Sequence, residues 1–122
     1  MTVTTPQKPG YRRGDVVLVL FPNSDLRTAK HRPALIVQAD ALETGMSQVI
    51  VAMITSRMFR ANHLSRVAVL LSTPEGQQSG LLTDSVVMTD SLATIVNSAI
   101  DRVIGSLPMV DVDTALRRTL GL

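Results

Sequence analysis

Short apolar segments separated by turn residues dominate this chain and limit what it can fold into. Each segment has four to nine residues, is rich in Val, Ile and Leu, and is bounded by Gly, Pro, Asn or Asp, as expected for β-strands. The segments are DVVLVLF (15–21), PALIVQ (33–38), SQVIVAMIT (47–55), RVAVLL (66–71), DSVVMTD (84–90) and RVIGSL (102–107). Because no long helix separates them, we expect a mainly β fold, with antiparallel strands in a strongly bent sheet or small barrel.

The C-terminal residues predict a helix in place of a seventh strand. In VDVDTALRRTLGL, Asp111 or Asp113 can cap the helix N-terminus, and Gly121 can end the helix in a left-handed conformation. Val112, Leu116 and Leu120 share one face, with Ala115 and Thr119 beside them. About three helical turns are marginal in isolation, so we expect this face to dock on the sheet. A weaker pattern in residues 91–101 predicts a helical turn there.

Length and composition limit the class of protein. With 122 residues, 45% of them apolar, the chain is expected to form one domain (1–122), with residues 1–12 as a flexible N-terminal extension. The sequence lacks cysteine, a secretory leader and any membrane-length apolar run, which indicates a soluble protein of the cytoplasm without membrane contact. Tyr11, Phe21 and Phe59 are its only aromatic residues, so we expect no aromatic platform of the kind on which many single-strand binders stack bases.

Charge is unevenly divided along the chain. Residues 1–66 carry nine Lys and Arg against four Asp and Glu, whereas residues 67–122 carry three against six. A basic half of this kind can mark a face that binds a polyanion. Ordinary solvated surface explains the same counts equally well.

Arg32 is the first candidate functional residue. It precedes Pro33, which biases it toward an extended backbone at the predicted strand entrance. Thr55 and Ser56 follow another predicted strand at its end. A guanidinium and two hydroxyls at strand ends can surround a phosphate. The alternatives are an ion pair of Arg32 with Asp25 or Asp40, and an ordinary turn at 55–56.

Three segments in order resemble the MazF/PemK family of toxin endoribonucleases. They are RGDVVLVLFPNSD (13–25), KHRPALIVQ (30–38) and VAMITS (51–56). GLLTDSVVMTDSLATI (80–95) and RVIGSL (102–107) resemble the distal strands of that family. The similarity covers residues 13–121, and the order and spacing of the motifs carry it.

The resemblance implies a fold, an activity and partners. Family members share with the CcdB group a small bent sheet of the Src-homology-3-like barrel type, a C-terminal helix and a homodimeric state. Active members cut single-stranded RNA without a metal or other cofactor, and a cognate antitoxin encoded nearby silences them. The expected function is therefore a sequence-specific, metal-independent endoribonuclease toxin of a type II toxin-antitoxin system. Two alternatives are a catalytically weak member that binds RNA or antitoxin, and a CcdB-like protein-binding inhibitor of gyrase.

Individual site residues also follow from the resemblance. The motif arginine falls on Arg32, the motif threonine and serine fall on Thr55 and Ser56, and a carboxylate of PemK-like members falls on Asp90. For the general base, His31 is the chemical rival of Asp90. Met88 and Ala93 stand where the family has arginines, which argues against transferring its acid and base pair. Candidate RNA-contacting residues are Arg27, Lys30, Arg57, Arg60, His63 and Arg66, although the segment 57–66 also reads as a flexible charged loop.

Overall fold

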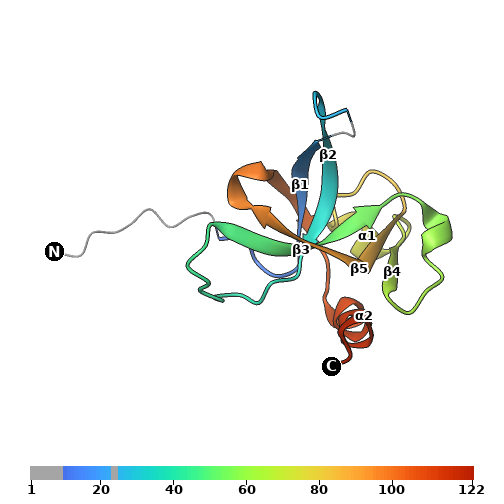
Figure 1. Ribbon diagram of the computed structural model, residues 1–122. Coiled ribbons are helices and arrows are strands. Elements are labelled where there is room, and N and C mark those ends of the chain that lie inside the picture. Colours follow the sequence, from blue (N-terminus) through green and yellow to red (C-terminus); the bar gives the residue numbers. More distant parts are fainter. Residues whose placement is uncertain (1–9, 23–24) are drawn as a thin grey trace.

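A single six-stranded antiparallel sheet forms the body of the protein in the computed structural model, which describes residues 10–22 and 25–122. The strands are β1 (Asp15–Pro22), β2 (Ala29–Ile36), β3 (Gln48–Thr55), β4 (Arg66–Val69), β5 (Ser85–Val96) and β6 (Ile100–Ser106). Their order across the sheet is β4-β5-β3-β2-β1-β6, and the sheet bends strongly without closing. The β1–β2 hairpin projects to one side and helix α2 lies on the other (Figure 1). The predicted mainly β class with a C-terminal helix is confirmed.

The second strand begins four residues earlier than the sequence predicted. We expected it at 33–38, but residues 29–32 already pair with β1, so Arg32 lies within the strand and not at its entrance. Pro33 is tolerated because pairing of β2 with β3 starts only at Ala34, opposite Met53. The Val37 N–H donates to the Ile50 carbonyl on β3, and the backbone nitrogen of every second residue of the strand points the same way. The nitrogen of Pro33 therefore faces β3 where the two strands are not paired, so its missing N–H costs no hydrogen bond.

The predicted helical turn over 91–101 is wrong for most of its length. Strand β5 continues to Val96 because Leu92 through Val96 pair with β3, so tertiary pairing decides the structure of this segment. Only Asn97–Ala99 form a 3-10 turn. A bulge between Ala52 and Met53 in the β3–β5 ladder leaves residues 89–91 without a partner on β3.

A short helix lies in the segment 72–80 between β4 and β5. Helix α1 (Pro74–Gln78) starts because the Thr73 hydroxyl accepts a hydrogen bond from the Gly76 N–H, with proline at the first helical position. The end of α1 lies directly against β6 at Gly105, where an added Cβ would approach Ser79 to 2.4 Å. Predicted strand 66–71 accordingly stops at Val69.

Helix α2 (Val110–Leu120) agrees closely with the prediction. It begins after Met109, so Asp111 and Asp113 lie in the first turn, where their charge favours the helix dipole, and neither caps the helix. Gly121 ends it at φ 71°, as expected. Leu120 is half exposed and lies outside the docked face. No helix among residues 10–22 and 25–122 is long and apolar enough to span a membrane.

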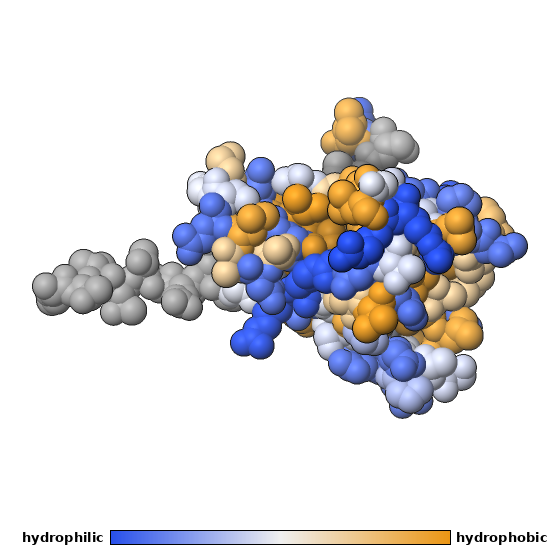
Figure 2. All heavy atoms as spheres, turned by 90° about the horizontal axis from the view of Figure 1, so that it is seen from below, coloured by the Kyte–Doolittle hydropathy of each residue, from blue (hydrophilic) through white to orange (hydrophobic). Residues whose placement is uncertain are grey.

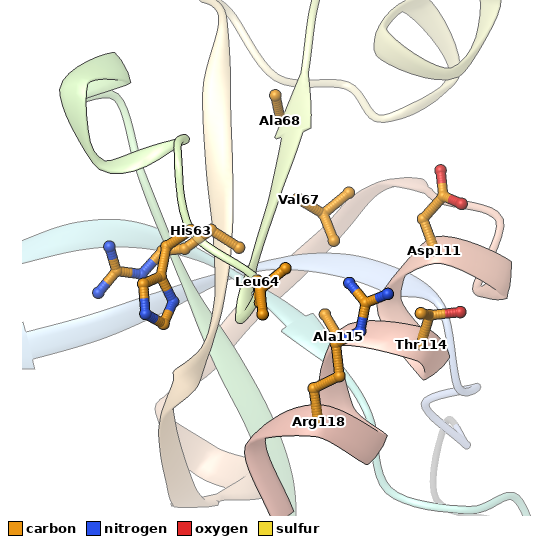
Figure 3. Close-up of a pocket in the computed structure, with 9 residues that line it drawn as sticks. His63, Leu64, Val67, Ala68, Asp111, Thr114, Ala115 and Arg118 are labelled. Atoms are coloured by element: carbon orange, nitrogen blue, oxygen red, sulfur yellow. The ribbon is translucent and has the colours of Figure 1, made fainter.

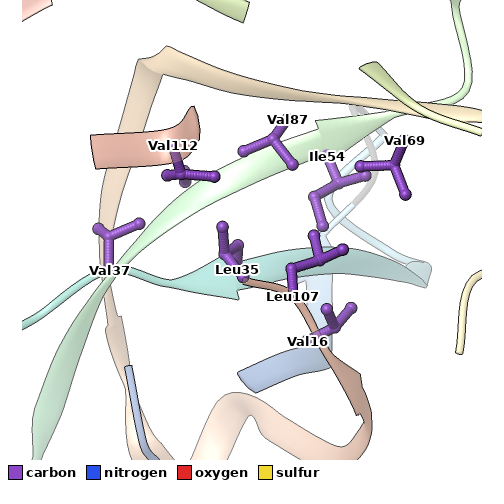
Figure 4. Close-up of a cluster of buried hydrophobic side chains, with 9 residues drawn as sticks. Val16, Leu35, Val37, Ile54, Val69, Val87, Leu107 and Val112 are labelled. Carbon is purple, nitrogen blue, oxygen red and sulfur yellow. The ribbon is translucent and has the colours of Figure 1, made fainter. Parts of the chain in front are cut away.

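Apolar side chains alternate between the two faces of the sheet and form two clusters. On β2, Leu35 joins the first cluster while Ala34 and Ile36 join the second. The first cluster lies under α2 and contains Val16, Leu35, Val37, Ala52, Ile54, Val69, Val87, Leu107 and Val112 (Figure 4). The second contains Val17, Val19, Ala34, Ile36, Val49, Val51, Ile95 and Ile100. Residues 1–9 of the predicted flexible extension lie outside the described residues, whereas Tyr11 packs against the second cluster.

Candidate active site

Arg32 and Thr55 lie on the neighbouring strands β2 and β3, near the same end of the ladder that joins these strands. The β2–β3 ladder ends at Ala34 opposite Met53, and Arg32 and Thr55 each lie two residues beyond this end. Side chains two residues apart on a strand share a face of the sheet, so Arg32 lies on the face of Ala34, and Thr55 on the face of Val51. Both Ala34 and Val51 belong to the second cluster, so Arg32 and Thr55 are on the same face. The two residues predicted to bind phosphate therefore lie beyond the same end of the ladder and on the same face of the sheet.

Arg32 makes no ion pair with any residue that the structure describes. Its side chain is exposed, and both carboxylates considered as partners are occupied elsewhere. Asp25 accepts hydrogen bonds from the backbone of Arg27 and Thr28, which lower its pKa, and Asp40 accepts one from the Arg13 N–H at 2.8 Å. An unpaired guanidinium is thus available for an anion.

The Thr55 hydroxyl is oriented by its own turn. Its Oγ1 accepts a hydrogen bond from the Arg57 N–H at 3.2 Å, which leaves the hydroxyl proton free to donate. Ser56 is exposed directly after the strand. A guanidinium and two hydroxyl groups, the kind of donors that bind a phosphate, thus lie beyond the same end of the β2–β3 ladder.

Asp90 is held by a two-point ion pair. Arg66 donates from Nη2 to Oδ2 at 2.7 Å and from Nε to Oδ1 at 3.1 Å. These hydrogen bonds lower the pKa of Asp90, outweighing the opposing effect of partial burial. Thr55 lies opposite Val86, four residues before Asp90 on β5, or about 13 Å along a regular strand. The structure therefore does not bring Asp90 beside Thr55.

The second candidate base also lies apart from Arg32. Adjacent residues on a strand point to opposite faces, so His31 is directed away from the face that carries Arg32. Its Nε2 lies 3.9 Å from Asp101 Oδ2 on the side of β6. Neither proposed base is in contact with the Arg32 and Thr55 pair.

Met88 faces the same side of the sheet as Asp90. It lies opposite Met53 on β3 and opposite Arg66 on β4, and its sulfur is 3.8 Å from Arg60 Nη1. The intervening Thr89 is buried toward α2, where its hydroxyl pairs with Thr119 at 2.7 Å. Met88 is half-buried, so the position at which the resemblance implies an arginine carries a partly exposed apolar side chain.

The connection between β3 and β4 is an ordered turn and not the flexible charged loop that was the alternative. A 3-10 turn spans Met58–Arg60, and Arg66 Nη1 donates to the Arg60 carbonyl at 3.1 Å. The His63 Nδ1 accepts the Ser65 N–H at 3.1 Å, which leaves the proton of the neutral ring on Nε2. Arg57 is exposed and makes no ion pair within the described residues.

The β1–β2 hairpin carries further exposed cations. Arg27 and Lys30 are exposed, and Lys30 lies on the same face of β2 as Arg32.

Two features of the site region were missed by sequence reasoning. The first is the Arg66 and Asp90 pair, whose members are 24 residues apart, and the second is the 77% exposure of Phe59. The sequence carries no local signal for the pair.

A groove among the described residues lies elsewhere. It has a volume of about 340 Å³ between β4 and α2, with Leu64 and Val67 on one side and Ala115 and Arg118 on the other (Figure 3). Neither Arg32 nor Thr55 lines it. Within residues 10–22 and 25–122, no group of three His, Asp or Glu side chains comes together as a metal site would require.

Comparison with known proteins identifies the family. Residues 12–120 match the model of the PemK-like, MazF-like toxins of type II toxin-antitoxin systems. The chain belongs to this family. A search of curated protein sequences gave no significant match.

Solved structures share the fold of this MazF-like toxin. An endoribonuclease from a mycobacterial species is 25% identical with a TM-score of 0.69, and the alignment covers 95% of this chain and 96% of the other. A mycobacterial endoribonuclease in complex with its cognate antitoxin is 24% identical with a TM-score of 0.68, covering 92% and 96%. The MazE-MazF complex from Deinococcus radiodurans is 18% identical with a TM-score of 0.68, covering 94% and 99%.

Proposed function

We propose that this MazF-like toxin cleaves single-stranded RNA at specific sequences, without a metal, in the cytoplasm. The observation that carries the proposal is that Arg32 and Thr55 lie just beyond the same end of the β2–β3 ladder, with the guanidinium free of the described acids. A protein-binding gyrase inhibitor would not need a phosphate site of this kind. The activity of the similar endoribonucleases supports the same reaction.

Cleavage would proceed by internal attack. The 2′-oxygen bonds to the adjacent phosphorus as its proton leaves, the bond from phosphorus to the 5′-oxygen breaks, and that oxygen takes up a proton. The products are a 2′,3′-cyclic phosphate and a 5′-hydroxyl end. The phosphorane formed on the way carries extra negative charge, which Arg32 neutralises and which the Thr55 and Ser56 hydroxyls stabilise by donating hydrogen bonds.

The position of Asp90 favours a weak nuclease. A carboxylate whose pKa is lowered by Arg66 is a poorer proton acceptor than an ordinary one, and His31 points to the other face. Rate acceleration would then rest mainly on charge stabilisation and on orientation of the RNA. Met88, in place of a cation, removes a further source of charge stabilisation.

Two protein partners belong to the proposal. The acidic, extended tail of a cognate antitoxin encoded nearby would suit the exposed cations Lys30, Arg32 and Arg57.

We also propose a homodimer that forms through an exposed apolar face. This face consists of Ile50, Leu92 and Val96, which are 37–53% exposed and lie on the same side of the sheet as the first cluster, outside the part that α2 covers. Viewed from the side of α2, apolar residues flank a hydrophilic band (Figure 2).

The test is cleavage of a long single-stranded RNA by purified protein in excess chelator. We expect slow cutting at defined sites with cyclic-phosphate ends, suppressed by the neighbouring gene product and relieved by salt. Gyrase and supercoiled DNA are assayed in parallel. Inhibition of gyrase with intact RNA would contradict the proposal, and RNA binding without any cutting would leave only the binding function.

A further inference from the structure

Of the three aromatic side chains in this protein, all within the described residues, Phe59 alone faces solvent. Tyr11 and Phe21 pack against the second cluster, whereas Phe59 is 77% exposed. Burying a phenylalanine side chain stabilises a fold, so leaving Phe59 outside forgoes that stability. Among the described residues, Phe59 is therefore the aromatic side chain that a bound strand could reach.

Several hydrogen bonds fix the backbone turn that carries Phe59. The 3-10 turn Met58–Arg60 is closed by Arg60 N–H to the Arg57 carbonyl at 3.0 Å and by Ala61 N–H to the Met58 carbonyl at 3.0 Å. The Arg60 guanidinium lies 5.7 Å from the ring centroid while its Nη1 contacts the Met88 sulfur. The turn is thus tied to β5, and Phe59 is presented by a fixed backbone.

This turn immediately follows the candidate phosphate site. Phe59 comes four residues after Thr55, and the exposed Arg57 lies between them. Arg60 has its guanidinium over part of the ring, an arrangement that favours further stacking on a π surface. Stacked aromatic and cationic groups beside a phosphate site are the combination that binds unpaired bases.

We propose that Phe59 is a base-stacking subsite, on which one base of the bound strand lies against the part of the ring that Arg60 leaves open. The subsite rests on the proposed RNA-cleaving function and adds to it a reason for choosing single strands. A base inside a duplex is already stacked on its neighbours and cannot lie on Phe59 without being extruded. Because every base has a π face, Phe59 adds affinity without reading base identity.

A tryptophan at position 59 gives a direct readout, since the natural chain contains no tryptophan. Phe59→Trp is titrated with 2′-O-methyl oligonucleotides of mixed sequence, which bind but cannot undergo internal attack, and with heparin, a polyanion without bases. We expect the oligonucleotides, and not heparin, to quench the fluorescence. Leu82→Trp is the matched control because Leu82 is 96% exposed and lies between α1 and β5, and its fluorescence should not respond to either probe.

Affinity gives a second readout. Stacking is worth about 1–3 kcal/mol per base, so Phe59→Ala should weaken oligonucleotide binding by at least about fivefold while heparin binding stays unchanged. Phe59→Leu, which keeps apolar bulk without a ring, should also weaken it. Circular dichroism should show an intact fold, because the side chain is exposed.

The outcomes separate the subsite from the nuclease activity. Quenching by oligonucleotides in a protein that does not cut RNA would support the subsite and contradict the proposed activity. Cleavage at the normal rate, with unquenched fluorescence in the Phe59→Trp variant and wild-type affinity in Phe59→Ala, would overturn the subsite alone. Equal quenching by heparin would show a charge effect and would also overturn it. Absence of any RNA binding would overturn both.

Discussion

At the residue scale, the central feature is that Arg32 combines a constrained backbone with a free charge. Its strand is paired with β1 on one side and followed by Pro33, so its Cα position is set by the sheet. A side chain fixed at its base pays less entropy to hold a phosphate than one on a mobile loop. The same reasoning applies to Thr55, whose hydroxyl is turned by the Arg57 N–H.

Arg32→Ala and Thr55→Ala should each lower RNA cleavage by at least about tenfold, the lower range for loss of one group that stabilises transition-state charge. Initial rates on a long single-stranded RNA measure this, with circular dichroism to confirm folding. Arg102→Ala is the control, because Arg102 is exposed on β6 and paired with Asp101. Folded variants that cut at the wild-type rate would show that the phosphate site is elsewhere.

The Asp90 carboxylate belongs to the same scale. Its pKa is lowered from 3.8 by hydrogen bonds from Arg66, so its contribution to stability is complete above about pH 4 and is lost as the carboxylate is protonated at lower pH. We expect the melting temperature of the wild type to exceed that of Asp90→Asn at pH 7, and this difference to shrink below about pH 4. Thermal melts of both proteins across this range measure it. A difference that grows on acidification would contradict the ion pair.

At the element scale, Arg13 ties α2 to the sheet. Its Nη2 contacts Asp113 at 2.6 Å in the first helical turn, and its Nε donates to the Val37 carbonyl at 2.9 Å. The side chain is only 26% exposed, so these bonds are partly shielded from water. Arg13, two residues before β1, thereby ties the C-terminal helix α2 to the sheet.

Arg13→Ala should reduce the free energy of unfolding by about 1–3 kcal/mol, since hydrogen bonds to charged groups and packing of the arginine stem are lost together. Urea denaturation gives the value. Asp111→Ala, an exposed acid in the same helical turn, is the control and should cost less than about 1 kcal/mol through the helix dipole alone. Equal losses would mean that the contact with Arg13 does not stabilise the docking of α2.

Local sequence patterns predicted which strands and helices form better than they predicted where these elements begin and end. The strands and the C-terminal helix follow from periodicity and turn residues, which are properties of neighbouring positions. The start of β2 and the length of β5 depend on pairing with β1 and β3, which the local pattern does not contain. Arg32 and Thr55 could likewise be proposed from their own segments, whereas the ion pair of Asp90 with Arg66 and the outward position of Phe59 required the folded chain.

At the scale of the whole molecule, the apolar face formed by Ile50, Leu92 and Val96 determines the expected assembly. Leu92→Arg should convert the proposed dimer to a 13.2 kDa monomer without unfolding it, because the side chain is already 37% exposed. Light scattering after size-exclusion chromatography measures the mass. Leu82→Arg, at a 96% exposed position, should remain dimeric. A monomeric wild type, or a dimeric Leu92→Arg, would place the interface elsewhere or remove it.

The strand order has a consequence for the time at which the protein becomes toxic. Arg32, Thr55 and Ser56 all lie on or next to β2 and β3, which leave the ribosome early, yet β3 needs β5 and β1 needs β6 as neighbours. Until those later strands emerge, Val87, Ile95 and Ile100 are missing from the two clusters, and the first three strands have no closed core. A nascent chain would therefore carry Arg32, Thr55 and Ser56 without a rigid frame. We expect cutting activity to require the later strands, so that the proposed antitoxin would meet finished molecules and not growing ones.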